Sequence, residues 1–262
     1  MMNVETMVRH MRQWAVAMMI GTVASMAPGA AGADQLKVLT AGAFKQVLLG
    51  IVPVFEDSGH TVELDADTVG GLVKRIQGGE SFDLVIASPS ALETLGKAGI
   101  VAGKATDLAR VGVGVGIKEG AAKPDLSTVE GFKRALLDAK AVAYIDPAAG
   151  GTSGIYIAAL LDKLGIGPQI KAKSVLVKGG FSAERIVSGE ADIAIQQISE
   201  ILPVKGVVLA GPLPTEIQNY TTYSAGIAAH TTNTAAATAL IDLIRGGKGE
   251  AIIRGRGMEP AL

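Results

Sequence analysis

Apolar runs of strand length alternate with helix-like segments between residues 36 and 99. In the helix-like segments apolar residues recur every three or four positions, as they do on one face of a helix. The runs are "LKVLTAG", "HTVELDAD" and "FDLVIAS", and the helical segments after them are "AFKQVLLGIVPVFEDSG", "GGLVKRIQGGE" and "PSALETLGKAG". Strands separated by short helices predict a parallel sheet with helices on both faces.

The pattern changes at "RVGVGVGIKEG", residues 110–120, where valine and glycine alternate. Glycine at every second position of a strand permits bending or a close approach of another segment. The strand–helix alternation then resumes, and a second extended run, "YTTYSAGIAAH", precedes one last helical segment at residues 233–255. We predict two α/β lobes joined by two crossing strands. Lobe 1 comprises residues 34–114 and 221–262, and lobe 2 comprises residues 115–220.

The first 33 residues have the order of a secretory signal peptide. A basic region with Arg9 and Arg12 is followed by the apolar run "WAVAMMIGTVASM" and then by small residues, including Ala31 and Ala33. This order predicts cleavage before Asp34 and a periplasmic mature protein. The alternative is an uncleaved anchor, but the apolar run is shorter than the roughly 20 residues of a comfortable span.

Composition excludes several classes of function. The 262 residues carry a formal net charge of −1, which gives no general attraction to nucleic acid. Cysteine is absent from the sequence, so disulfides, thiolate metal sites and cysteine nucleophiles are excluded. Of the two histidines of the mature chain, His60 falls in a helix–strand turn and His230 past a strand, so they form no cluster at a ligand loop. We therefore expect no metal and no other cofactor.

Four glycine-containing loops follow predicted strands, two from each lobe. In open α/β sheets, ligands bind beyond the carboxyl ends of the strands, where backbone N–H groups at helix starts attract anions. Together the loops predict an anion site, although each glycine alone is explained as well by a tight turn. The loops are "TAGAFK" (40–45), "DADTVGG" (65–71), "DPAAGGTSGIY" (146–156) and "VKGGFS" (177–182).

At these loops the chain resembles the periplasmic molybdate-binding protein family, the type II solute receptors of ABC importers. The resemblance covers nearly the whole mature chain, and its most specific segments are "DPAAGGTSGIYIAALLDKLG" and "IVSGEADIAI". It implies an α/β, two-lobed type II periplasmic binding protein fold with a ligand cleft between the lobes. It also implies a monomer without cofactor that binds an oxyanion and delivers it to an importer permease.

The residues at the family's ligand positions differ from that pattern. Ala43, Val69 and Gln197 stand where the family places side-chain hydroxyls, while Ser153 and Gly179 occupy positions where it uses mainly backbone groups. An oxyanion oxygen left unpaired in a buried site costs roughly 1–3 kcal/mol or more. We therefore expect molybdate to be a poor ligand.

The replacements suit a larger organic anion that carries carboxylates. Lys45 and Lys178 supply cations, and hydroxyls, amides and backbone groups supply further donors. The alternative for each lysine is a solvated surface residue. The full set of expected substrate-binding residues is Ala43, Thr68, Val69, Gly70, Thr152, Ser153, Gly179, Gln196 and Gln197.

Two functions remain open at this point. One is a receptor for an organic anion. The other is an enzyme on the same fold, because one branch of the proteins that resemble the molybdate receptors works as aconitate isomerase. That branch implies an allylic proton shift on a bound tricarboxylate, with Lys45, Lys178 and Tyr156 as the candidate catalytic residues. None of the three stands out as the base, because a lysine beside carboxylates is held in its charged form.

Overall fold

The computed structural model describes residues 35–261. The predicted signal peptide and the mature N-terminus at Asp34 lie outside this range. Within residues 35–261, no helix combines the length and the apolar character that a membrane span needs. In this described part of the chain, ten strands form one mixed sheet, whose main path runs β2-β1-β3-β9-β4-β7-β5-β6. This is an α/β fold, as the alternating pattern predicts.

The first part of the sheet is parallel, and each strand leads into a helix. β1 pairs with β2 on one side and with β3 on the other. The side chains of β1 and β3 are almost all buried, which explains their nearly continuous apolar runs. The elements are β1 (Gln35–Ala41), α2 (Gly42–Glu56), β2 (Thr61–Asp67), α3 (Val69–Gln77), β3 (Leu84–Ala87) and α4 (Pro89–Lys97).

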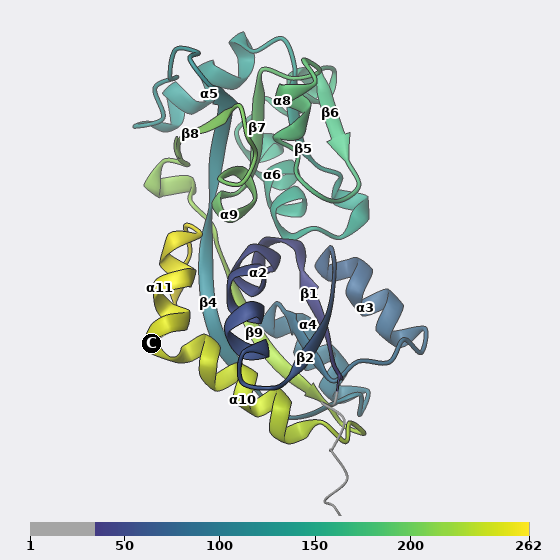
Figure 1. Ribbon diagram of the computed structural model, residues 1–262. Coiled ribbons are helices and arrows are strands. Elements are labelled where there is room, and N and C mark those ends of the chain that lie inside the picture. Colours follow the sequence, from purple (N-terminus) through teal and green to yellow (C-terminus); the bar gives the residue numbers. More distant parts are fainter. Residues whose placement is uncertain (1–34, 262) are drawn as a thin grey trace, which may run out of the picture. The chain divides into compact units, whose positions relative to one another are not determined.

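Two long antiparallel strands, β4 (Val101–Lys118) and β9 (Tyr220–Ala228), connect the two parts of the sheet (Figure 1). β4 begins nine residues before Arg110, where the sequence pattern predicts its start. Its first residues are polar and turn-like, and they pair with β9 through register shifts, so the pattern does not mark them as a strand. The glycines of β4 allow close packing. A carbon added at Gly114 would lie 2.7 Å from Cγ1 of Ile198.

The second part of the sheet repeats the parallel arrangement. β5 pairs in parallel with β6 and β7, and β7 pairs antiparallel with β4. Phe132, Ile157 and Ile195 belong to its buried core. Its elements are α5 (Val129–Asp138), β5 (Val142–Ile145), η1 (Pro147–Ala149), α6 (Thr152–Lys163), α7 (Gly167–Lys171), β6 (Ser174–Val177), α8 (Glu184–Val187), β7 (Ile193–Gln197), α9 (Ile198–Ile201), β8 (Val207–Pro212) and η2 (Thr215–Ile217).

The C-terminal segment is two helices, so the prediction of a single helix over residues 233–255 is wrong. α10 (Thr234–Arg245) and α11 (Gly247–Gly255) are separated at Gly246, whose ψ of 168° is extended. The second helix starts against the end of the first: a carbon added at Gly249 would lie 2.1 Å from the Ile244 carbonyl oxygen. Both helices pack against α2, and β10 (Glu259–Pro260) then pairs with β4.

Candidate functional site

A cavity of about 310 Å³ lies where the carboxyl ends of several strands lead into helices. Its volume is at the lower end of the range for small-molecule sites. Residues from all four glycine-containing loops line it, among them Ala43, Thr68, Ser153 and Gly179. The parallel strands of each part of the sheet point the same way, and this brings loops far apart in the sequence to one place.

Two of the helices that begin at the cavity have open N-termini. α2 follows Ala41 and α6 follows Gly151, and among residues 35–261 no side chain caps either helix with a hydrogen bond. α3 differs, because Thr68 Oγ1 accepts a hydrogen bond from the Gly71 N–H. The first N–H groups of a helix have no partner inside it and carry partial positive charge. The starts of α2 and α6 therefore suit the oxygens of an anion.

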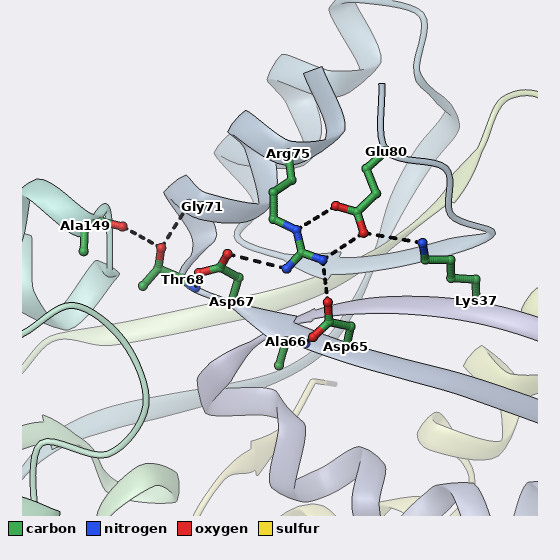
Figure 2. Close-up of polar contacts among 9 residues, drawn as sticks. All are labelled: Lys37, Asp65, Ala66, Asp67, Thr68, Gly71, Arg75, Glu80 and Ala149. Carbon is green, nitrogen blue, oxygen red and sulfur yellow. Dashed lines mark hydrogen bonds and ion pairs between the residues drawn. The ribbon is translucent and has the colours of Figure 1, made fainter. Parts of the chain in front are cut away.

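Loops from the two parts of the sheet contact each other beside the cavity through two hydrogen bonds. Thr68 Oγ1 donates to the Ala149 carbonyl oxygen at 2.5 Å (Figure 2), and the Gly70 N–H donates to the Gly150 carbonyl oxygen at 3.1 Å. A carbon added at Gly70 would lie only 2.8 Å from Gly150 Cα. Gly70 therefore serves this contact between loops, and it lies outside the residues that line the cavity.

Replacing Gly70 by Ala is expected to separate the two loops, because the added methyl group overlaps Gly150. Losing the contact should weaken the binding of a cavity ligand by about 1–3 kcal/mol, the cost of one or two hydrogen bonds. Small-angle X-ray scattering should show a larger radius of gyration. Gly247→Ala is the matched control, since a carbon there meets no atom within 4 Å among the described residues. An unchanged radius and affinity in Gly70→Ala would contradict this role.

Arg75 of α3 organises the carboxylates behind one wall of the cavity. Figure 2 shows its guanidinium between Glu80, Asp65 and Asp67, with Lys37 joining Glu80 from β1. Hydrogen bonds from Arg75 hold the pKa values of Asp65 and Glu80 below their ordinary values. Of the three carboxylates, Asp67 alone lines the cavity, and its other oxygen accepts from the Thr68 N–H. These partners offset the repulsion that Asp67 would exert on an anion.

A buried carboxyl group, Glu200, forms another part of the wall. Glu200 stands on α9, directly after β7, and is only 7% exposed. A carbon added at Gly42 would lie 3.0 Å from Glu200 Oε1, so the carboxyl group reaches the first residue of α2. No lysine, arginine or histidine within residues 35–261 forms an ion pair with it. Burial without a cation raises the pKa of Glu200 to about 8.

Tyr223 of β9 lines the same cavity and is 1% exposed. Burial raises its pKa, and the nearby Glu200 raises it further, so the hydroxyl keeps its proton. Gln197 Nε2 lies 3.4 Å from the Tyr223 hydroxyl and 2.6 Å from Thr152 Oγ1. The cavity lining thus includes a carboxyl group and a phenol that can exchange or donate protons.

Eight of the predicted site residues line the cavity. Lys45 is half-buried in the first turn of α2, and its charge lowers the pKa of Asp65 in a minor way beside Arg75. Gln197, Thr152 and Thr68 bring polar side chains. The eight residues are Ala43, Lys45, Thr68, Val69, Thr152, Ser153, Gly179 and Gln197.

The remaining predicted site residues lie elsewhere. Lys178 is exposed and outside the lining residues, because its side chain leaves the β6 end toward solvent. The Tyr156 hydroxyl donates to the Ile217 carbonyl oxygen at 2.6 Å and its ring packs on an apolar core. The Gln196 side chain accepts from Ser182 and donates to Gly180, which holds the loop after β6 in place. Neither Lys178 nor Tyr156 lines the cavity.

Several lining residues are not predicted from the sequence, among them Asp67, Phe181, Glu184, Glu200 and Tyr223. For Glu200 a signal existed: an acidic residue between Ile198 and Ile201, three positions after the last residue of a buried strand. For Tyr223 the strand's alternation marks an inward position but does not show which cavity it faces. Within residues 35–261, no group of three or more acidic or histidine side chains is placed to hold a metal ion.

Comparisons with known proteins agree on the fold. The profile of the family described as bacterial extracellular solute-binding protein matches residues 36–259. Aconitate isomerase from a Pseudomonas species is 28% identical over 233 residues, which cover 86% of this chain and 87% of the relative. The periplasmic molybdate-binding protein of Azotobacter vinelandii superposes with a TM-score of 0.70 at 22% identity, over 87% of this chain and 99% of that chain. A sulfate-binding protein of Mycobacterium tuberculosis gives a TM-score of 0.68 at 16% identity, over 87% of each chain. The two-lobed type II periplasmic binding protein fold is thereby shown.

Proposed function

Because the chain belongs to the bacterial extracellular solute-binding proteins, we propose that it is an exported, periplasmic protein whose cavity takes a small organic polyanion of the aconitate type. We further propose that it interconverts cis- and trans-aconitate by proton transfer. The support for the substrate class is the anion-binding character of the cavity. The support for turnover is the pair of buried proton-carrying groups in its wall.

The observation that carries the proposal is the cavity's combination of anion-binding and proton-carrying groups. The open N-termini of α2 and α6 and the half-buried Lys45 provide positive potential on one side. Glu200 and Tyr223 lie on the same cavity, shielded from bulk water. An allylic proton shift needs a base beside its carbon acid, whereas a receptor that only holds an anion needs none.

The relationship to an aconitate isomerase supports this choice of reaction, since 28% identity extends over most of both chains. The second candidate is a receptor that delivers the anion to an importer permease, which the family membership favours. The two candidates share the ligand class and differ in turnover. A proton NMR spectrum of the purified protein mixed with cis-aconitate separates them.

In that experiment the isomerase hypothesis predicts new vinyl and methylene resonances of trans-aconitate, at a rate proportional to protein concentration and unaffected by EDTA. Tight binding measured by calorimetry, together with no trans isomer above the protein-free blank, would establish the receptor instead. Neither binding nor conversion would exclude the whole substrate class.

Molybdate is expected to bind weakly. The three positions where hydroxyls are expected, Ala43, Val69 and Gln197, do line the cavity, and two of them carry apolar side chains. Each oxyanion oxygen left without a donor costs roughly 1–3 kcal/mol. Isothermal titration calorimetry should therefore show no submicromolar affinity for molybdate, with aconitate as the comparison ligand. Submicromolar molybdate binding would contradict the proposed ligand class.

A further inference from the structure

We propose that Glu200 is the proton acceptor of this protein, removing a proton from the methylene carbon of a polycarboxylate held in the cavity. The inference rests on the proposed function and deepens it, because no lysine or tyrosine predicted from the sequence provides a base. It follows from where the carboxyl group lies, what surrounds it and what the other ionisable groups of the cavity are doing.

Glu200 is placed to face a ligand in the cavity. It lines the cavity, and Oε1 reaches the start of α2, where the N-terminal N–H groups are open. A ligand carboxylate bound at those N–H groups would place its neighbouring carbon beside the Glu200 carboxyl group. α9 is anchored there by Ser199, whose Oγ donates to the Ala43 carbonyl oxygen at 2.8 Å. The acid is therefore held against the helix that binds the anion.

The other ionisable groups of the cavity are unsuited to accept a proton from carbon. Asp67 is engaged by Arg75 and by the Thr68 N–H, and Glu184 is exposed to water. Lys45 is suited to bind the negative charge of the ligand. Tyr223 keeps its proton through burial and the neighbouring carboxyl group. Glu200, removed from water and unpaired with a cation within residues 35–261, is a stronger base than an ordinary carboxylate once ionised.

The same carboxyl group both removes the proton and returns it. The carboxylate of Glu200 takes the methylene proton, and the electron pair of the broken C–H bond enters the allylic system, so that negative charge builds on a substrate carboxylate. The Tyr223 hydroxyl and the α2 N–H groups are placed to donate hydrogen bonds to that charge. Return of the proton from Glu200 to the other end of the allylic system moves the double bond and regenerates the carboxylate.

The test compares the wild-type protein with Glu200→Gln, with Glu200→Asp, and with Glu216→Gln as a control on the exposed η2 turn. Conversion of cis-aconitate is followed by proton NMR and binding by calorimetry. Gln should lower kcat by about 10²–10⁴-fold, the usual contribution of a positioned acid or base. Binding should change far less. Asp should recover part of the rate, and Glu216→Gln should match the wild type.

A pH profile gives an independent readout. kcat/KM of the wild type should rise about tenfold per pH unit up to about pH 8 as the free carboxyl group ionises. Loss of affinity in Glu200→Gln with kcat unchanged would assign Glu200 to ligand binding and overturn the proposal. A Gln variant with more than a tenth of the wild-type kcat would also overturn it while leaving the proposed function intact. No conversion by the wild type would overturn both.

Discussion

Replacing Glu200 by Gln is expected to make the ligand-free protein more stable in alkaline solution, by about 4 kcal/mol at pH 8. The folded protein raises the pKa of this carboxyl group from 4.5 to about 8 by burying it. Each unit of pKa difference between the folded and unfolded states corresponds to about 1.4 kcal/mol. The raised pKa therefore lowers the free energy of unfolding by roughly 4–5 kcal/mol at pH values above both pKa values. The neutral amide of Gln has nearly the same shape and carries no such electrostatic cost.

The direction of the pH dependence follows from proton counting. Between pH 4.5 and about 8 the unfolded chain has released the Glu200 proton and the folded protein still holds it. The unfolded state binds fewer protons, so stability falls as pH rises through this window. Below pH 4.5 both states are protonated and the contribution of Glu200 disappears. The wild type should lose stability relative to Glu200→Gln between pH 5 and pH 8.

Urea unfolding of both proteins at pH 5 and pH 8.5 measures this effect. The expected result is a small difference in the free energy of unfolding at pH 5 and a difference of several kcal/mol at pH 8.5. Glu216→Gln, which changes an exposed carboxylate, should show no such pH-dependent gain. Equal differences at both pH values would mean that Glu200 is not a buried acid in solution. If Glu200→Gln gains stability and loses activity, Glu200 serves function although it destabilises the folded protein.

The second large effect is expected at Lys45. Replacing Lys45 by Met should weaken the binding of aconitate by about 1.5–3 kcal/mol, the worth of a hydrogen bond to a charged group. The reason is its place in the first turn of α2, half-buried at the cavity. The positive charge there adds to the potential of the open helix N-terminus. Met keeps most of the length and the apolar character of the stem.

Lys178→Met is the matched control. Both lysines come shortly after a strand of the sheet, but Lys178 is exposed and outside the cavity lining. Calorimetry at low and at physiological ionic strength should show a large loss for Lys45→Met and a change within about 0.5 kcal/mol for Lys178→Met, as is usual for surface substitutions. Equal losses in the two variants would point to a long-range charge effect in place of a contact.

Most of the fold could be predicted because its signals are local. Buried parallel strands such as β1 and β3 appear as unbroken apolar runs, and the short helices after them keep their helical spacing. The start of β4 could not be predicted, since its polar residues pair with β9 through register shifts that depend on tertiary contacts. The break at Gly246 was missed because helical periodicity continues on both sides of it.

The site was predictable to the extent that it is made of loops. The rule that ligands bind beyond the carboxyl ends of strands brings Ala43, Thr68 and Ser153 together. It does not find Tyr223, which comes from the middle of an antiparallel strand, or Glu200, because acidic residues are almost never fully buried and are expected at the surface. Lys178 shows the limit of the rule: it precedes the cavity-lining Gly179, yet it is exposed and does not line the cavity.

The placement of β9 between β3 and β4 has a consequence for biosynthesis. Leu84 of β3 pairs with Ile227, a partner more than 140 residues later in the chain. The sheet therefore stays open at its centre until nearly the whole polypeptide has been made. Such long-range pairing slows folding, because the entropy of closing a long loop must be lost before the strand contacts form. A nascent chain of this topology remains unfolded for longer, which fits the proposed export of the chain across a membrane before it folds.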